Sequence, residues 1–249
     1  MEGAPESETV VLLHGLARGP LSMWLLAHAL GRAGYDVINL GYPSRRQDLA
    51  GLTALVRARL ATRAPAPGRS ATLHGVGHSL GGLVLLAALR DPPPPWQARR
   101  LVTLGSPHRG ASIAARLMGW RAAQRFFGPV LADLAPASVA RRRALAAGRA
   151  PLEVGVIAGA GSRRPLAPAV LLDRRRALMR TTDGTVELRS ALGAPWLFPR
   201  TDRLVVDVSH WFLPASPAVI RATTAFLARG RFTGPDGLSP SAASSAFEE

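Results

Sequence analysis

The chain has 249 residues and a formal net charge of +15, and it contains no cysteine. All 31 basic residues are arginine, so lysine is absent as well. These absences exclude disulfides, cysteine nucleophiles, cysteine-ligated metals, Walker-A phosphate loops and pyridoxal Schiff bases. A single domain of this length can bury a full hydrophobic core.

The arginines are scattered along the chain, with short clusters only at Arg141–Arg143 and Arg174–Arg176. Few aromatic residues alternate with them, and no nucleic-acid-binding motif accompanies them. We therefore expect no nucleic-acid partner. We also expect no transmembrane segment, because the apolar run Leu83–Leu89 is far shorter than the ~20 residues of a membrane span.

Apolar runs and helical periodicity alternate along most of the chain. The first run, Thr9–Leu13, ends at His14-Gly15 and predicts a strand that is buried on both faces. Further buried strands are predicted at 35–40, 71–76, 101–104, 152–158 and 204–208, and helices at 21–33, 48–62, 80–90 and 217–228. Such alternation is typical of βαβ units, so we expect an α/β fold with a mostly parallel, doubly wound sheet and helices on both faces.

Between the fourth and fifth predicted strands the alternation stops. Residues 111–134 predict two short amphipathic helices separated by Gly128-Pro129, with no strand between them. These helices carry an apolar stripe that should be buried, formed by Ile113, Leu117, Trp120, Phe127 and Leu131.

The two ends of the chain have compositions typical of unstructured segments. Residues 1–8 are acidic and lack the basic stretch of a secretory signal, which favours a flexible N-terminus and a cytoplasmic location. Residues 231–249 are rich in Gly, Pro, Ser and Ala and predict a disordered tail. The folded domain is expected to span 9–230.

The sequence Gly77-His-Ser-Leu-Gly81 matches G-x-S-x-G, the motif around many nucleophilic serines. With 16 serines and 25 glycines in the chain, about 0.2 matches are expected by chance, so the context decides. An apolar strand runs into Ser79 and a helix follows it, as the sharp turn that exposes such a serine requires. The alternatives are a glycine-rich turn with an idle serine, or a dinucleotide motif from Gly75 whose last glycine would fall on Leu80.

A nucleophilic serine needs a base and donors for the oxyanion. His210 follows the last predicted strand and lies at the carboxyl edge of the sheet, where ligands bind in open α/β sheets. We therefore prefer His210 to His108 as the base. The oxyanion donors in this architecture are the N–H of the residue after the nucleophile, here Leu80, and an N–H of the loop after the first strand, for which we favour Leu16. The preceding His14 is expected to shape that loop through hydrogen bonds.

The base must be oriented by a carboxylate that lies between the serine and the histidine in the sequence. Asp183, in the turn Thr182-Asp-Gly-Thr-Val186, is our candidate. Asp207 is the alternative, but it is placed on a strand three residues before His210 and should point away from it. This chemistry needs no cofactor and no metal ion.

Together these motifs resemble the α/β-hydrolase superfamily, within it the bacterial lipase-like branch that includes relatives of GPI inositol-deacylase and lecithin:cholesterol acyltransferase. The shared motifs are His14-Gly-Leu16, Gly77-His-Ser-Leu-Gly-Gly82, Thr103-Leu-Gly-Ser-Pro-His-Arg-Gly110, Asp183-Gly-Thr-Val186 and His210. The resemblance implies an esterase or lipase with Ser79, Asp183 and His210 as catalytic triad. It also implies that the segment 111–148 caps the site.

The chain departs from larger members of the branch, because it starts at the strand that carries His14 and shows no acidic cluster for calcium. These departures favour an intracellular carboxylic-ester hydrolase acting on a small or lipid-like ester. Trp120 and Phe127 are candidates for the acyl pocket, the alternative being an ordinary surface helix. The alternative functions are a thioesterase, acyltransferase or amidase on the same fold, or a non-catalytic binding protein.

Overall fold

A computed structural model describes residues 7–63, 65, 70–147, 150–161, 182–193 and 201–232. Its centre is a six-stranded sheet with the strand order β2-β1-β3-β4-β5-β6, in which all neighbouring strands are parallel. The strands are β1 (Thr9–Leu13), β2 (Asp36–Leu40), β3 (Thr72–His78), β4 (Gln97–Leu104), β5 (Glu153–Gly159) and β6 (Thr201–Val206).

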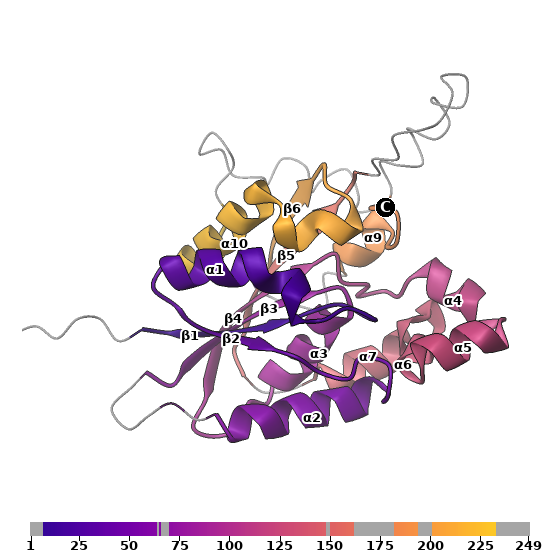
Figure 1. The fold of residues 1–249 in the computed structure, drawn as a ribbon, viewed down its shortest axis with the longest axis horizontal. Helices are drawn as coiled ribbons and strands as arrows, with labels where there is room; N and C mark the ends of the chain where they lie inside the picture. The colour runs from indigo at the N-terminus through magenta and orange to yellow at the C-terminus, as the bar shows by residue number, and fades with distance from the viewer. Residues whose placement is uncertain are drawn as a thin grey trace, which may run out of the picture.

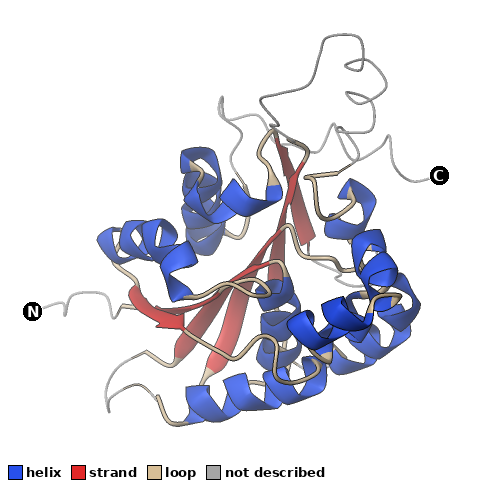
Figure 2. Ribbon diagram, turned by 45° about the vertical axis from the view of Figure 1, so that its right-hand side comes forward, coloured by secondary structure: helices blue, strands red, loops and turns tan. Residues whose placement is uncertain are grey.

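Helices cover both faces of the sheet, as Figures 1 and 2 show. One face carries α1 (Trp24–Arg32) and α10 (Pro217–Arg229), and the other carries α2 (Leu49–Ala61) and α3 (Leu80–Leu89). The short α9 (Leu188–Ala191) packs beside β5. The predicted α/β fold with a doubly wound parallel sheet is confirmed.

The two hydrophobic cores follow from the alternation of side chains along each strand. In β1, Val10 and Leu12 belong to the core under α1 and α10, whereas Val11 and Leu13 belong to the core under α2 and α3. All four side chains are fully buried, because a central strand covered on both faces has no solvent side. This is why the sequence shows a continuous apolar run at this strand.

Both edge strands differ from the prediction. The segment 35–40 was expected as a buried strand, but β2 lies at the sheet edge, where Asp36 is exposed and only Leu40 is buried. At the other edge, β6 ends at Val206 rather than Val208, and a bend at Asp207 leads the chain toward His210. An edge strand has one neighbour, so its sequence pattern fixes its ends less well.

Residues 111–134 form three short α-helices instead of the two expected, and a fourth follows at 139–145. They are α4 (Ser112–Met118), α5 (Arg121–Phe127), α6 (Val130–Leu134) and α7 (Val139–Leu145), and we call them the α4–α7 segment. The expected burial of the apolar stripe is wrong for Ile113 and Trp120, which are 45% and 69% exposed, although Leu131 is buried. The reason is that α4 and α5 project from one end of the molecule and pack mainly on each other and on α6 (Figure 1).

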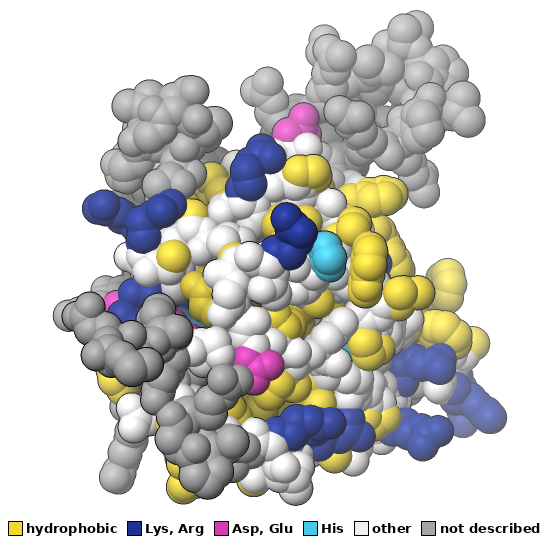
Figure 3. Space-filling model, turned by 60° about the vertical axis from the view of Figure 1, so that its left-hand side comes forward, with side chains coloured by type: hydrophobic (Ala, Val, Ile, Leu, Met, Phe, Trp, Pro, Cys, Tyr) yellow, Lys and Arg dark blue, Asp and Glu magenta, His cyan; other side chains and the backbone are white. Residues whose placement is uncertain are grey.

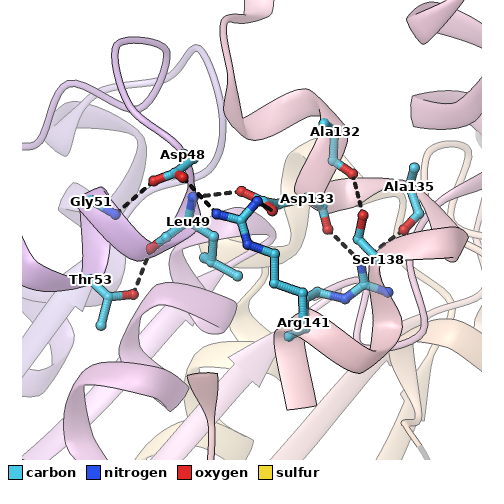
Figure 4. Close-up of polar contacts among 10 residues, drawn as sticks. Asp48, Leu49, Gly51, Thr53, Ala132, Asp133, Ala135, Ser138 and Arg141 are labelled. Atoms are coloured by element: carbon cyan, nitrogen blue, oxygen red, sulfur yellow. Dashed lines mark hydrogen bonds and ion pairs between the residues drawn. The ribbon is translucent and has the colours of Figure 1, made fainter. Parts of the chain in front are cut away.

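A buried carboxylate fixes the α4–α7 segment to α2 (Figure 4). Asp133 of α6 is 1% exposed; its Oδ2 accepts the Leu49 N–H at 2.7 Å and its Oδ1 pairs with Arg141 at 2.9 Å. Arg141 also pairs with Asp48, the N-cap of α2, at 2.6 Å. The first turn of α2 is therefore bonded to two successive helices of the segment.

Most of the ends that were predicted to be unstructured, residues 1–6 and 233–249, lie outside the described residues. In the part of the chain that is described, none of the helices is long and apolar enough to cross a membrane. The same described part has no group of three or more His, Cys, Asp or Glu residues that could hold a metal ion.

Candidate active site

Ser79 stands in a strained turn between β3 and α3. Its φ of 53° lies in the left-handed region that side-chain-bearing residues rarely adopt. The turn is held by a 2.8 Å hydrogen bond from the Ser79 N–H to the Leu104 carbonyl. A β-carbon on Gly81 would lie 2.6 Å from the His14 carbonyl oxygen, so only glycine fits there. The small residues thus let the turn approach β1 and leave Ser79 partly exposed.

The turn lies at the point where the order of the strands in the sheet changes direction. The chain leaves β1 for β2 on one side and returns to β3 on the other, which places the ends of β1 and β3 next to each other. A β-carbon on Gly15 would lie only 3.2 Å from the Ser79 β-carbon, so the loop after β1 packs directly on Ser79. Leu16 is in this loop, and Leu80 is the first residue of α3, where a backbone N–H has no partner within the helix.

The structure brings Asp183 and His210 together. The His210 Nδ1–H donates to Asp183 Oδ2 at 2.7 Å, and the two residues are 4% and 2% exposed. The second carboxylate oxygen of Asp183 accepts the N–H groups of Thr185 and Val186 at 3.0 and 2.8 Å. With both oxygens bonded, the carboxylate has a fixed orientation and favours the imidazole tautomer that carries its proton on Nδ1.

The end of β4 packs against this pair. Gly105 has a φ of +58°, and a β-carbon there would lie 3.0 Å from both His210 Nδ1 and Asp183 Oδ2. Asp207, the alternative acid, lies elsewhere, with its Oδ1 beside Gly161. The partner of the His210 ring is therefore Asp183.

His78 is a further residue of this site, to which the sequence analysis gave no role. Its Nε2–H donates to the His210 carbonyl at 3.0 Å, and the two rings are 4.7 Å apart. Burial, then the charges of His210 and Arg18, hold the pKa of His78 well below its usual range. A neutral ring directly before Ser79 thus fixes the backbone of His210. Its position inside the G-x-S-x-G motif was the signal for it.

The other two histidines near the site have structural surroundings. His14 donates from Nδ1 to the Gly15 carbonyl at 2.9 Å and stacks on Tyr42, whose hydroxyl donates to the His14 carbonyl at 2.8 Å. This agrees with the loop-shaping role expected for His14. His108 is buried beside Thr103, with 3.1 Å between Nε2 and Oγ1, and burial lowers its pKa to about 3.

One side of the site has an apolar rim. Trp211 and Phe212, directly after His210, are 59% and 66% exposed, and their 3-10 helix packs against α1 and the 3-10 helix Pro20–Met23. Leu21 and Trp24, at the start of these elements, are also exposed. On the face drawn in Figure 3, apolar side chains gather along the right-hand edge.

The two candidate acyl-pocket residues lie on α5 and just before it. Trp120 is the N-cap of α5 and is mostly exposed. Phe127, the last residue of α5, is half-buried against the core and meets Phe126 edge-on at 4.9 Å. The two side chains therefore differ in how firmly they are held.

The sequence model of the alpha/beta hydrolase family matches residues 10–223, which include every element and residue of the site just described. The chain belongs to the alpha/beta hydrolase family. The match runs from Val10 in β1 to Thr223 in α10. A comparison with curated proteins gives no significant match.

Solved structures of similar fold include a bacterial lipase. The mature lipase BlEst2 of Bacillus licheniformis is 18% identical, with a TM-score of 0.67 over 92% of this chain and 94% of that chain. A gene product of Listeria innocua is 20% identical, with a TM-score of 0.63 over 90% and 95%. EstA of Clostridium botulinum is 9% identical, with a TM-score of 0.59 over 86% and 84%. At these identities the comparison shows a shared fold.

Proposed function

We propose that this hydrolase cleaves carboxylic esters through a covalent acyl-enzyme on Ser79, with His210 as base and Asp183 as the acid that orients it. The observation that carries the proposal is the buried His210–Asp183 pair, which lies at the same sheet edge as the strained turn of Ser79. A histidine oriented by a carboxylate whose oxygens are all hydrogen-bonded is the arrangement that activates a serine hydroxyl.

The mechanism has two acyl-transfer steps. His210 Nε2 accepts the Ser79 hydroxyl proton while Oγ attacks the ester carbonyl, and the same proton then goes to the departing alcohol. The oxyanion that forms is stabilised by the N–H groups of Leu16 and Leu80. A water molecule, deprotonated by His210, attacks the acyl-enzyme; the acid leaves, and Ser79 regains its proton.

The surroundings of the site support an ester with an apolar part. The exposed rings of Trp211 and Phe212 offer an apolar surface beside His210. We assign Trp120 and Phe127 to the acyl-binding side, so the α4–α7 segment caps the site. A structural relative named as a lipase fits this substrate class.

A series of p-nitrophenyl esters from acetate to palmitate tests the proposal. The wild-type protein should hydrolyse members of the series, and Ser79→Ala should lower kcat by about 10⁴-fold or more, because the nucleophile is lost. Thioesters and anilides of the best acyl group are the comparison substrates. Faster turnover of a thioester or an anilide than of the matched ester would contradict the ester assignment.

A further inference from the structure

A cavity of about 520 Å³ opens between the loop after β1, the loop after β2 and the helix α5. Four arginines line it, from three separate parts of the sequence: Arg18, Arg45, Arg46 and Arg125. On the face drawn in Figure 3, in contrast, arginine side chains lie in several separate groups. The cavity therefore brings four positive charges together on one concave surface.

The charge in the cavity has no acidic counterpart among the described residues. The other lining residues are neutral: Ala17, Tyr42, Pro43, Ser44 and Phe126. None of the ion pairs found among the described residues involves a cavity arginine. Asp48, the acid of the loop after β2, is paired with Arg141 instead. A cavity lined by one sign of charge raises the local concentration of ions of the opposite sign.

Two of the four guanidinium groups are held in place by neutral partners. Arg18 lies 5.1 Å from the centre of the Trp211 ring and donates to the Trp211 carbonyl at 3.0 Å. Arg45 lies 4.9 Å from the centre of the Phe126 ring and donates to its carbonyl at 3.4 Å. Each guanidinium has five N–H donors in a planar fork, so donors remain for a carboxylate or a phosphate.

The cavity shares its walls with the candidate active site. Ala17, next to the proposed oxyanion donor Leu16, donates from its N–H to Ser44 Oγ at 3.1 Å. Tyr42 donates to the carbonyl of His14, at the start of the same loop. Arg18 contacts Trp211, the residue after His210. A molecule bound in the cavity therefore lies against the loop that packs on Ser79.

We propose that this arginine cavity binds an anionic oxygen group, a carboxylate or a phosphate, carried by the ester substrate. The identity of the ligand as substrate rests on the proposed function, whereas the anion site itself rests on the cavity. The bond that is cleaved remains the carboxylic ester at Ser79, and the anionic group positions the ester and is released unchanged with one of the products.

Binding of small anions tests the site without any turnover. Inorganic phosphate and glutarate are titrated into the protein by calorimetry at constant ionic strength, with Arg46→Gln, Arg125→Gln and Arg116→Gln as variants. Arg46 and Arg125 are exposed and line the cavity, whereas Arg116 is an exposed arginine on α4 outside it. We expect saturable binding that each cavity variant weakens about five- to tenfold and that Arg116→Gln leaves unchanged. The same affinity in all four proteins, or no saturable binding, would overturn the anion site.

Matched ester pairs test the role of the site in substrate choice. One pair is p-nitrophenyl hexanoate and mono-p-nitrophenyl adipate; the other is hexanoylglycerol and hexanoylglycerol phosphate. The wild-type kcat/KM should favour the anionic member of at least one pair, and the double variant Arg46→Gln/Arg125→Gln should reduce that preference about tenfold or more. The adipate arm reports a carboxylate and the glycerol phosphate arm a phosphate.

The outcomes separate the two proposals. Ester hydrolysis without preference for either anionic substrate would overturn the cavity's role in substrate binding and leave the proposed function intact. Hydrolysis of no ester would overturn the proposed function, and the arginine dependence of phosphate and glutarate binding would still decide the anion site.

Discussion

His78 Nε2–H and the carbonyl oxygen of His210 are joined by a hydrogen bond of 3.0 Å that connects the residue before Ser79 to the backbone of the proposed base. His78 and His210 are 132 positions apart in the sequence. Because the His78 ring is buried and its pKa lowered, the ring stays neutral and donates from one fixed nitrogen. We infer that His78 is a positioning residue for His210.

Replacing His78 by alanine should lower kcat by about 10- to 100-fold with little change in KM, because the base loses its backbone support. His78→Gln should recover much of the activity, since a glutamine amide can donate to the same carbonyl. Turnover is measured per serine that reacts with a fluorophosphonate, so unfolded protein is not counted. Equal activity per reactive site in all three proteins would assign His78 a purely structural role.

Asp183→Asn should reduce kcat by about 10⁴-fold, because an amide in place of the carboxylate favours the wrong tautomer of His210. The equivalent change Asp207→Asn is the matched control and should have a much smaller effect, since the Asp207 side chain lies beside Gly161. Steady-state kinetics on the best p-nitrophenyl ester compares the two variants. The opposite ranking would make Asp207 the acid.

The sequence predicted the parts of the fold that depend on local pattern. A strand buried on both faces gives an uninterrupted apolar run, so Val10 to Leu13 identified β1 and the glycines around Ser79 identified the turn. The order Ser, Asp, His along the chain also follows from the architecture. The pairing of Asp183 with His210 could be proposed on these grounds, because Asp183 lies between Ser79 and His210 in the sequence and His210 follows the last strand.

Contacts between distant segments could not be predicted in this way. Exposure of Ile113 and Trp120 depends on how far α4 and α5 project from the sheet, which periodicity does not encode. The burial of Asp133 depends on its meeting the first turn of α2, some 84 residues earlier in the chain. The cavity arginines likewise come together only in the folded chain, so their scattered positions in the sequence did not predict a cluster.

The acyl-pocket assignment predicts how the rate depends on chain length. Each methylene bound in an apolar pocket contributes about 0.8 kcal/mol, so kcat/KM of the wild type should rise about three- to fourfold per CH₂ until the pocket is full. Trp120→Ala and Phe127→Ala should flatten this rise and affect acetate esters much less. Trp120→Ala is the cleaner variant, because that side chain is mostly exposed and its loss should hardly change stability.

Val205→Ala, an exposed apolar position on β6, is the control and should keep the wild-type slope. Equal losses for acetate and octanoate esters in Trp120→Ala and Phe127→Ala would mean that these side chains only support the fold.

Asp133→Ala should lower the free energy of unfolding by about 3 kcal/mol, because the Leu49 N–H and the Arg141 guanidinium lose a buried charged partner. Urea unfolding followed by circular dichroism measures the change. The control Asp91→Ala removes a solvent-exposed pair with Arg57 and should change the free energy by less than about 0.5 kcal/mol. Similar small losses in both variants would show that the anchor between α2 and the α4–α7 segment contributes little.

The central claim is that Ser79 is a nucleophile activated by His210, and covalent labelling tests it most directly. Wild-type protein is incubated with a fluorophosphonate, its intact mass is measured, and the modified peptide is mapped. We predict one adduct per chain on Ser79, no adduct in Ser79→Ala, and strongly slowed labelling in His210→Ala with the fold retained in both variants. An undiminished adduct in Ser79→Ala would contradict the account, as would a folded wild-type protein that does not react.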